Sequence, residues 1–448
     1  MAAISNNTVI ELFKNVYGDM HDIVPKDQIL SREIPWVDGA MVGTKFIEDV
    51  VLGAEVGMTW GGSGQEAFEI NSAIAGAVKQ TEVTPYVSVL PSILPFATVS
   101  RSAGGGEKAF LAATKFITKN NLTSHDELRE VARLYGQASS GLGYVSYYSG
   151  TYRGASFSNG TGTLTIDPSG TTLAFTNGIN AASKAILFQL GSYAPGFWVG
   201  KQGIRVAQVA TSSGVVVASG KLVSTNPELG YITVDFTPVA ASSATSHKMV
   251  YWGWQDSGEN PGIQYILSRR GSLFGINNST YQLFQGSMYN VNNVALSLGI
   301  LQKAVAAAVG GAGLEGDLLV LVNPRTWSNL GQTEAGLRVY DDSYSPEQAK
   351  NGFKALEYYS QNGKLSIVAH RCVKEGDAFA LKRETWKRSG SAQIGFKVPG
   401  MDGVNGQLIR ELENQAGFKF QSYTDEYMFC YQPGHNIYLY GINDQADA

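Results

Sequence analysis

The side chains in this sequence that could perform acid–base, metal or thiol chemistry lie far apart along the chain. The five histidines are His21, His125, His247, His370 and His435. None is followed by Glu and none has a second His four residues away, so the zinc-protease pattern is absent. The cysteines, Cys372 and Cys430, form no CxxC pair. This argues against a zinc site or a disulfide framework and favours a reducing, intracellular place of synthesis.

The glycine-rich stretches also lack the context of a nucleotide site. The Gly-Lys pairs at Lys201, Lys221 and Lys364 are not followed by the Ser or Thr that contacts magnesium in a P-loop. One GxGxxG match, at residues 311–316, comes after an expected helix and before an expected strand. That is the reverse of the order that aims a helix N-terminus at pyrophosphate, so we interpret the match as a helix stop and a turn. No GxSxG nucleophile elbow occurs.

A pair of adjacent carboxylates, Asp341 and Asp342, is the remaining candidate for a metal ligand. Adjacent carboxylates attract hard cations, but here they precede Pro346, where a helix is expected to begin, and we interpret them as a solvated turn. The sequence therefore predicts no catalytic, cofactor-binding or metal-binding residues and no enzyme activity. A triad assembled in space from distant residues is the alternative.

Composition points to a globular protein with a sizeable core. Hydrophobic residues make up 44% of the 448 positions and charged residues 16%, so large-scale disorder is not expected. A net charge of −4 gives no electrostatic footprint for nucleic acid or an anionic membrane. The first 20 residues carry Glu11 and Lys14 within the apolar pattern and predict no signal peptide. We expect a soluble protein.

The N-terminal segment is expected to contain one short amphipathic helix that ends at Gly18. Its apolar residues recur at helical spacing and include Ile10, Phe13 and Tyr17. A helix of this length is marginal alone and must dock its apolar stripe on its own domain or on a partner.

Residues 43–60 and 77–90 predict the two strands of a long arm with a glycine-rich segment between them, at Gly61, Gly62 and Gly64. An isolated two-stranded ribbon is barely stable in water, so the arm should lie on another surface. Pro85, Pro91 and Pro95 should confine the returning strand to a sheet edge. The alternative is an ordinary hairpin that folds back on its own domain.

Two helical patterns follow the arm. The first includes Phe110 and Phe116, and the second includes Leu128, Val131 and Tyr135 before Gly136. Ser124 with Glu127 three residues later fits a capping box, which would begin a new helix there. One long bent helix and two stacked helices are both compatible with the sequence, and either would form a stiff backbone for the domain.

Residues 141–260 change character and carry only 11 charged residues in 120 positions. Short alternating runs at 161–166, 204–209, 214–217 and 231–236 are separated by turn signals such as Asn226-Pro227, which predicts a small β-barrel or sandwich. A cluster of aromatic residues could form a sugar-stacking platform, but we favour a place in the core or seam. These residues are Tyr193, Trp198, Trp252 and Trp254.

The rest of the chain predicts an α+β domain. A helix is expected at 293–309, followed by a buried strand at 318–322 and a helix from Arg325. Strands are expected at 365–369 and 378–381, and a closing β pair at 418–431 and 437–440.

Four segments, taken together, resemble the C-terminal half of the major capsid proteins of tailed bacteriophages, a fold shared with herpesvirus capsid floors and encapsulins. They are SRRGSLFGINNSTYQLFQGSMYNVNN, LVLVNPRTWSNL, YDDSYSPEQAKNGF and GFKFQSYTDEYMFCYQPGHNIYLYGIN. The arm and the helical segment agree in order with that family's extended loop and spine helix.

The resemblance implies an α+β capsid fold made of an N-terminal arm, an extended β-hairpin loop, a spine helix, and peripheral and axial domains, with an inserted all-β domain. The implied divisions are 1–37 (arm), 38–103 (extended loop), 104–152 (spine helix and peripheral domain), 153–258 (inserted β-rich domain), 259–415 (mainly axial domain) and 416–448 (returning strands).

The implied function is self-assembly into hexamers and pentamers of an icosahedral phage head, with a precursor shell that expands as DNA enters. Implied partners are the chain itself, a scaffolding protein, a portal, a decoration protein and packaged DNA by weak contact, with no membrane; the location is the virion, after assembly in the host cytoplasm. We expect the contacts between subunits to involve Ile10, Phe13, Tyr17, Trp36, Lys45, Trp60, Gly61, Gly62, Gly64 and Tyr86. The alternatives are an encapsulin-like compartment and a carbohydrate-binding tail or adhesin protein acting through the inserted domain.

Overall fold

A computed structural model places most of the chain. The structure describes residues 28–37, 41–42, 45–61, 63, 68–96, 107–146, 149–152, 155–158, 164–166, 173–175, 184–188, 193–210, 214–227, 230–238, 247–254, 259–335, 356–360, 363–396, 410–412 and 416–444. The predicted N-terminal helix, the carboxylate pair at Asp341 and the helix expected at Pro346 lie outside these residues.

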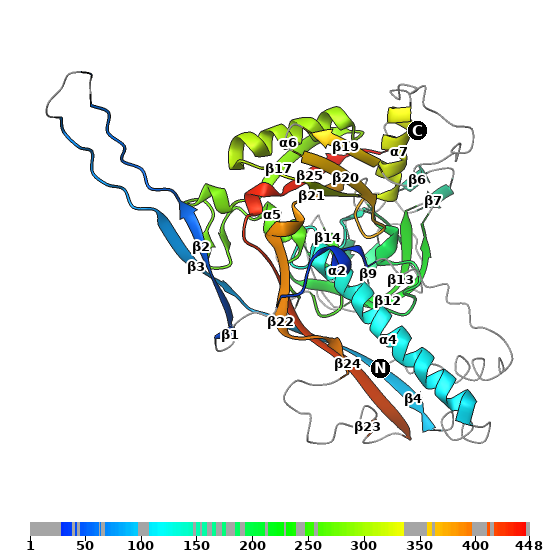
Figure 1. The fold of residues 1–448 in the computed structure, drawn as a ribbon. Helices are drawn as coiled ribbons and strands as arrows, with labels where there is room; N and C mark the ends of the chain where they lie inside the picture. Colours follow the sequence, from blue (N-terminus) through cyan, green and yellow to red (C-terminus); the bar gives the residue numbers. More distant parts are fainter. Residues whose placement is uncertain are drawn as a thin grey trace, which may run out of the picture.

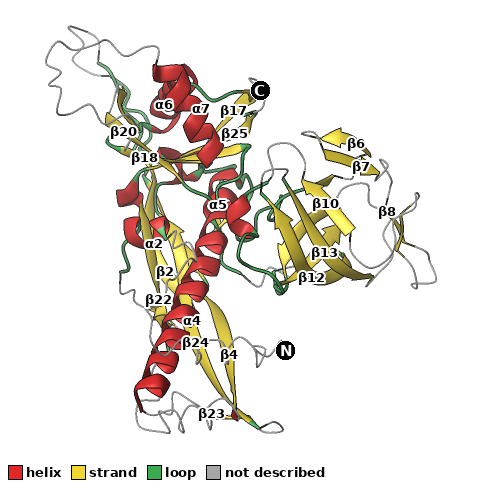
Figure 2. Ribbon diagram, turned by 90° about the vertical axis from the view of Figure 1, so that its right-hand side faces the viewer, coloured by secondary structure: helices red, strands yellow, loops and turns green. Residues whose placement is uncertain are grey.

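The described chain is a mixed α+β structure, as the sequence predicts, and it contains one long helix. Figure 1 shows a two-stranded arm projecting to one side, a sheet with two helices above, and long strands running beside helix α4 (Glu107–Tyr135). In Figure 2 a second large sheet, which contains β10 (Lys184–Phe188), β12 (Val216–Asn226) and β13 (Tyr231–Pro238), lies to the right of α4.

The upper sheet has the strand order β17-β25-β21-β18-β20-β19. Strand β18 (Leu318–Val322) lies in its middle with every residue buried, as its unbroken apolar run predicts. It pairs in parallel with β20 (Gly363–Ala369) and antiparallel with β21 (Asp377–Leu381). Strand β25 (Ile437–Ile442) separates β21 from β17 (Ser287–Val294), and β19 (Leu356–Ser360) forms the far edge.

Helix α6 (Leu298–Ala312) packs on this sheet, but the boundaries expected from the sequence are wrong. Asn292 and Asn293 have φ angles of 61° and 60°, a left-handed backbone that cannot start a helix. The Ser297 hydroxyl instead accepts a hydrogen bond from the backbone N–H of Ile300 and caps the start. The helix runs past Gly310 to Gly313, whose φ of 70° ends it. The 311–316 match is thus a helix stop and a turn. Helix α7 (Pro324–Ala335) follows β18.

The helical patterns after the arm form the single continuous helix α4. The capping box predicted at Ser124 is therefore wrong, because Ser124 lies inside the helix, where backbone N–H groups already have partners. Glu127 reaches away from the helix to Arg371 and to the Nζ of Lys201, the latter at 3.4 Å. The Glu127 carboxylate thus pairs with Lys201 and Arg371 and caps no helix.

A third sheet lies beside α4 and joins distant parts of the chain. Its central strand β24 (Gly417–Cys430) pairs along one edge with β4 (Tyr86–Pro95) and along the other with β22 (Trp386–Gly395) and β23 (Arg410–Glu411). The predicted returning strand 77–90 is therefore wrong as one element. It breaks at Thr84 and Pro85 into β3 (Ala77–Val83), which belongs to the arm, and β4.

The predicted closing β pair is also wrong, because β24 and β25 belong to different sheets. The short turn Pro433–His435 carries the chain from one sheet to the other, and Arg383–Thr385 does the same between β21 and β22. The Asn436 side chain joins the two crossings, since its oxygen accepts hydrogen bonds from the Lys382 backbone N–H at 2.8 Å and the Trp386 indole N–H at 2.7 Å.

The second large sheet comes from the low-charge stretch and has the order β14-β11-β12-β13-β10-β5. Its strands are β5 (Val145–Ser146), β10 (Lys184–Phe188), β11 (Arg205–Ala210), β12 (Val216–Asn226), β13 (Tyr231–Pro238) and β14 (His247–Tyr251). Asn226 ends β12 at the predicted turn. Two small hairpins lie in the same stretch, Ser149–Tyr152 with Ala155–Ser158 and Leu164–Ile166 with Leu173–Phe175.

Aromatic side chains join this sheet to the long helix. Tyr135 of α4 contacts Phe197 with ring centroids 5.5 Å apart, and Phe197 and Tyr251 each contact the buried Trp198. Helix α5 (Ile263–Ser268) packs into the same core. The prediction that these aromatic residues lie in the core is therefore confirmed for Trp198, whereas Trp252 is 40% exposed.

Candidate assembly surfaces

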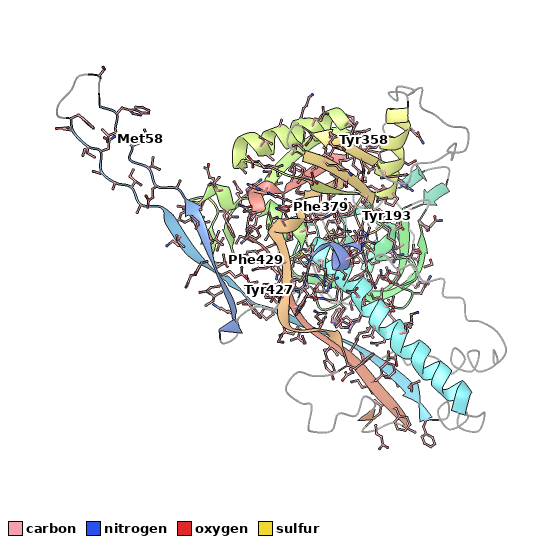
Figure 3. All side chains as sticks on the ribbon, viewed as in Figure 1. Met58, Tyr193, Tyr358, Phe379, Tyr427 and Phe429 are labelled. Carbon is pink, nitrogen blue, oxygen red and sulfur yellow. The ribbon has the colours of Figure 1, made fainter. Side chains whose placement is uncertain are left out.

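The arm combines an extended backbone with an outward-facing apolar surface. Strands β2 (Lys45–Gly53) and β3 pair antiparallel, and Val56 and Ile74 exchange backbone hydrogen bonds of 3.1 and 2.9 Å farther out. Large apolar side chains are exposed along this length: Val51 73%, Met58 70%, Trp60 82%, Ile70 81% and Val78 59%. Met58 stands on the outer part of the arm in Figure 3, away from the rest of the subunit.

Glycines make the narrow outer part of the arm possible. A Cβ on Gly57 would lie 2.9 Å from the carbonyl oxygen of Ser72, and one on Gly76 would lie 2.9 Å from that of Gly53. The Phe68 ring sits 2.7 Å from where a Gly61 side chain would begin. Glycine fits the close backbone approaches at Gly57 and Gly76 and so lets the two chains of the arm lie near each other there. Of the predicted glycine-rich segment, Gly62 and Gly64 lie outside the described residues.

The base of the arm, in contrast, is anchored in the subunit. Phe46 and Val83 are buried against Tyr427 and Phe429 of β24, and the Phe46 and Tyr427 ring centroids are 4.5 Å apart. Lys45 pairs with Glu82 across the two strands. The arm is thus fixed at one end and open at the other.

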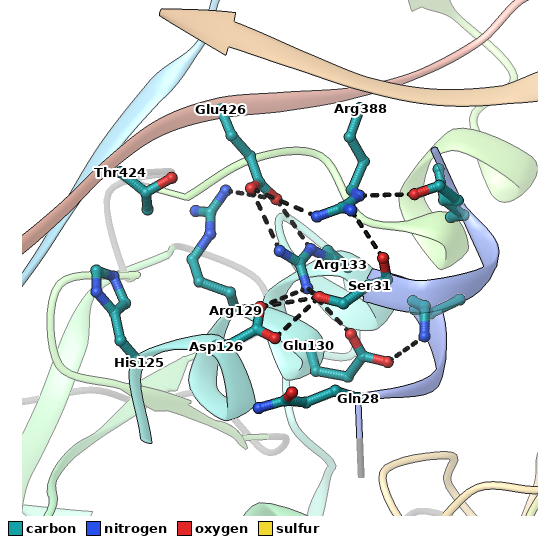
Figure 4. Close-up of polar contacts among 12 residues, drawn as sticks. Gln28, Ser31, His125, Asp126, Arg129, Glu130, Arg133, Arg388, Thr424 and Glu426 are labelled. Atoms are coloured by element: carbon teal, nitrogen blue, oxygen red, sulfur yellow. Dashed lines mark hydrogen bonds and ion pairs between the residues drawn. The ribbon is translucent and has the colours of Figure 1, made fainter. Parts of the chain in front are cut away.

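A cluster of buried charges holds residues 28–37 against α4 and β24 (Figure 4). Arg133 lies at its centre and donates hydrogen bonds to Glu426 at 2.9 Å, Asp126 at 3.0 Å and Glu130 at 3.1 Å. The Nη2 of Arg129 lies 3.2 Å from the Glu426 carboxylate. Arg133, Glu130 and Glu426 are each no more than 2% exposed, so these ions are costly to bury and depend on one another.

The charges of this cluster shift the ionisation of its members. Burial alone would raise the pKa of Glu426, but Arg133 and Arg129 outweigh it and lower that pKa to about 2. Burial and the nearby Arg129 lower the pKa of His125 to about 4. His125 is therefore neutral at pH 7, and its ring nitrogens contact the hydroxyls of Ser88 and Ser422, each at 2.8 Å.

The cluster contacts helix α2 (Ile29–Glu33) and the residues directly after it. Arg388 donates to the backbone oxygens of Ser31 at 2.8 Å and Ile34 at 3.0 Å, and the Leu30 backbone N–H donates to Glu130. Trp36, predicted as a contact between subunits, forms a parallel bridge with Arg388 of β22 and is half-buried in this subunit.

Sequence reasoning missed this cluster although it leaves a signal. Asp126, Arg129, Glu130 and Arg133 follow spacings of three, four and seven residues, which put them on one face of a helix. Such a stripe usually marks a solvated face. Here Glu426 and Arg388, from the end of the chain, cover it and convert it into a buried one.

A second buried network fixes the C-terminal end of α4. The Tyr135 and Tyr438 hydroxyls donate to the Asp377 carboxylate at 3.0 and 2.8 Å, and the Gln264 amide donates to Tyr438 at 2.7 Å. Burial raises the pKa of Asp377, and it lowers the pKa of Lys374, whose ammonium donates to the Gly141 carbonyl, to about 8. This network joins the helix to the upper sheet and to the start of the low-charge stretch.

The predicted site residues fall into four groups. Trp60 and Gly61 lie together on the open part of the arm, while Lys45 lies at its base. The Tyr86 hydroxyl accepts a hydrogen bond from the Gln137 amide at 3.2 Å, within the subunit. Leu128, Val131 and Tyr135 pack into the core, and Phe110 and Phe116 lie on α4 with side chains outside the description. Outside the described residues are Ile10, Phe13, Tyr17, Gly62 and Gly64.

Within the described ranges, no three His, Cys, Asp or Glu side chains are grouped so as to hold a metal ion. Cys372 and Cys430 are free thiols in the interior. No helix in the described part of the chain has both the length and the apolar character needed to cross a membrane.

The chain is similar to chains in several solved structures of capsids and of an encapsulin. The chain is similar to one in the capsid asymmetric unit of cyanophage A-1(L), with 11% identity over 96% of each chain and a TM-score of 0.49. It is similar to the SrpI encapsulin of Synechococcus elongatus, with 7% identity, 99% and 98% coverage and a TM-score of 0.40. It is also similar to the capsid of the native GTA particle, with 7% identity, 96% and 94% coverage and a TM-score of 0.41. No protein-family model matches the sequence, and no curated protein matches it.

Proposed function

We propose that this chain is the structural subunit of a closed icosahedral shell, a major capsid protein of the tailed-phage type that encloses packaged DNA. The observation that carries the proposal is the open arm, with apolar side chains 59% to 82% exposed along an extended backbone. A soluble monomer rarely exposes such a surface, because covering a large apolar side chain stabilises by about 1.5–3 kcal/mol. A neighbouring subunit provides that cover.

The rest of the subunit fits a rigid building block. The base of the arm is packed on β24, and the charge cluster and the Tyr135 network tie α4 to the third sheet and to the upper sheet. An arm of one copy that reaches a different surface of the next gives a head-to-tail contact, which closes into rings when the rotation allows. Rings of six and five copies are the units of an icosahedral shell.

The divisions of the capsid fold map onto the structure in this proposal. The arm formed by β2 and β3 is the extended loop, α4 is the spine helix, the third sheet belongs to the peripheral domain and the upper sheet to the axial domain. The six-stranded sheet from the low-charge stretch is the inserted β-domain. A scaffolding protein, a portal and expansion of a precursor shell in the host cytoplasm complete the assembly pathway of the virion.

Electron microscopy of the purified full chain, alone and co-expressed with the products of neighbouring genes, tests this function. We expect closed shells or isolated rings of five and six subunits. Persistent monomers or fibrous trimers under all conditions would refute it, and fibrous trimers that bind sugars would favour an adhesin. Shells that enclose a protein cargo and no DNA would instead identify a cargo compartment.

A further inference from the structure

A cavity of about 690 Å³ lies within the subunit, between β4, α4 and the six-stranded sheet of the low-charge stretch. Strand β4 lines it from Val87 to Ile93, a length of about 20 Å at the usual rise of a strand. Its volume falls within the roughly 300–1,000 Å³ that is typical of pockets for small molecules. The cavity is therefore large enough for a small molecule and is elongated along β4.

Most of the cavity lining is apolar or aromatic. Leu90 of β4 and Leu128 of α4 contribute aliphatic side chains. The residues at the end of the six-stranded sheet contribute three rings, of which Tyr251 and Trp254 have centroids 5.0 Å apart and Trp252 is 40% exposed. Such walls favour a ligand whose main part is apolar, because water gains little from contact with them.

A buried cation in the lining has an unused hydrogen-bond donor. Arg129 is 4% exposed, and its Nε has no hydrogen-bond partner among the described residues. The Nη2 of the same guanidinium lies 3.2 Å from Glu426, which also accepts from Arg133 at 2.9 Å. Buried donors in folded proteins are almost always paired, so an unpaired donor beside a cavity points to an acceptor group inside it.

The charges that line the cavity favour an anion as that acceptor. Within the described residues the charged side chains are those of Arg129, Arg205 and Glu259, and the Arg205 guanidinium lies 3.5 Å from the centroid of the Trp252 ring. Burial raises the pKa of Glu259 to about 7, so this carboxyl carries less than a full negative charge near neutral pH. His125 also lines the cavity and is neutral there. The lining is therefore positive on balance.

We infer that this cavity binds an aliphatic carboxylate, with its chain along β4 and its carboxylate at the Nε of Arg129. A carboxylate oxygen accepts the unused Nε–H in a charge-assisted hydrogen bond, and the chain covers Leu90, Leu128 and the aromatic rings. The bound molecule then contacts β4, α4 and the six-stranded sheet at once and stabilises their junction. This inference is independent of the proposed shell function.

Three probes separate the contributions of the head and of the chain. Octanoate has both, 1-octanol keeps the chain without the charge, and acetate keeps the carboxylate without the chain. In calorimetric titrations of the full chain we expect one octanoate per subunit, bound at least tenfold more tightly than 1-octanol, and no detectable binding of acetate. Equal affinity for octanoate and 1-octanol would overturn the anionic head, and no binding of octanoate would overturn the site.

Filling the cavity tests where octanoate binds. Val89→Trp enlarges a lining residue that is 42% exposed, and Val223→Trp on β12, at a residue that is 49% exposed and outside the cavity, is the matched control. We expect the first variant to bind octanoate at least tenfold more weakly than the wild type, with unchanged circular dichroism, and the control to bind it normally. Wild-type affinity in Val89→Trp, or an equal loss in the control, would contradict binding in this cavity.

Arg129→Lys tests the contact with the carboxylate, because it keeps a positive charge near Glu426 and removes the Nε donor. We expect the affinity for octanoate to fall at least fivefold and that for 1-octanol to stay unchanged. An equal loss for both probes would show a structural role only and overturn the assignment of Arg129. If this variant does not fold, the wild-type affinities for octanoate and 1-octanol decide the assignment. Electron microscopy of the same preparations reports assembly separately, so failure to bind octanoate would leave the shell function intact.

Discussion

In most proteins apolar side chains are buried and charged ones are exposed, and two regions of this subunit depart from that rule. The arm exposes apolar side chains, and the charge cluster at α4 buries charged ones. The arm carries large apolar residues outward, with Trp60 82% exposed, whereas the cluster buries Arg133, Glu130 and Glu426 almost completely. Charges inside a subunit are tolerable when each has a fixed partner in the same chain, and they then specify one arrangement of α2, α4 and β24. Apolar groups outside are tolerable when a partner from another chain covers them. The comparison separates the part that fixes the subunit from the part that we propose to join subunits.

Removing the centre of the cluster should produce the largest effect. Arg133→Met leaves the buried carboxylates of Glu130 and Glu426, and the partly exposed carboxylate of Asp126, with too little positive charge. We expect the free energy of unfolding to fall by about 3–5 kcal/mol in urea denaturation. Arg32→Met, the same change at a side chain that is 73% exposed, should alter it by less than about 0.5 kcal/mol. Equal effects of the two substitutions would show that the cluster does not fix the subunit.

Acid should weaken the cluster in a defined window. The folded-state pKa of Glu426 is lowered to about 2 from 4.5, so its contribution is fully present above pH 4.5 and is lost as the pH falls toward 2. The wild type should therefore lose about 3 kcal/mol of its advantage over Glu426→Gln across that window. Urea titrations of both proteins at several pH values measure this difference, and a difference that stays constant would contradict the ion-pair account.

The arm should behave in the opposite manner, with a large effect on assembly and little on folding. Trp60→Asp should remove the contact between subunits that we propose for Trp60, which would be worth about 2 kcal/mol, and should abolish shells at concentrations where the wild type assembles. Its unfolding free energy should stay within about 0.5 kcal/mol of the wild type. Tyr359→Asp on β19 is the control, because Tyr359 has the same 82% exposure. If Trp60→Asp failed to fold, or if it still assembled into shells, the proposed role of the arm in assembly alone would be contradicted.

The smallest effect is expected at the base of the arm. Lys45 and Glu82 pair there with side chains 49% and 52% exposed, and exposed pairs contribute about 0–1 kcal/mol. Lys45→Met should therefore lower the unfolding free energy by less than about 1 kcal/mol, and by less still at high salt. A larger, salt-independent loss would mean that the arm is held at its base by more than the packing of Phe46 on Tyr427.

Local patterns in the sequence predicted the elements whose environment is set by nearby residues. The five apolar residues of β18 lie in the middle of a sheet, Asn226 ends β12 at a turn, and Pro91 and Pro95 mark a strand edge. The predictions were wrong where the structure depends on contacts between residues that are far apart in the sequence. Glu127 pairs with Arg371 and Lys201 and so caps no helix. β24 and β25 separate into two sheets because Asn436 fixes the turn between them against Trp386.

The candidate surfaces divide in the same way. Trp60 and Gly61 were predicted as contacts because an apolar, glycine-rich ribbon cannot bury itself, and both are exposed on the arm. The charge cluster was not predicted, since it joins α4 to β22 and β24, which are far apart in the sequence. The low-charge stretch likewise shares a core with its host through Phe197, Trp198 and Tyr135, a contact that no local pattern signals.

Hydrogen–deuterium exchange of the arm in free subunits and in assembled particles tests the central claim most directly. If a second copy covers the arm, the backbone amides of residues 54–76 will exchange rapidly in free subunits and will be protected at least tenfold in particles. The amides of β18, buried within one subunit, should be protected equally in both. Equal exchange of the arm in the two states would contradict the account, because the arm would then contribute no contact between subunits.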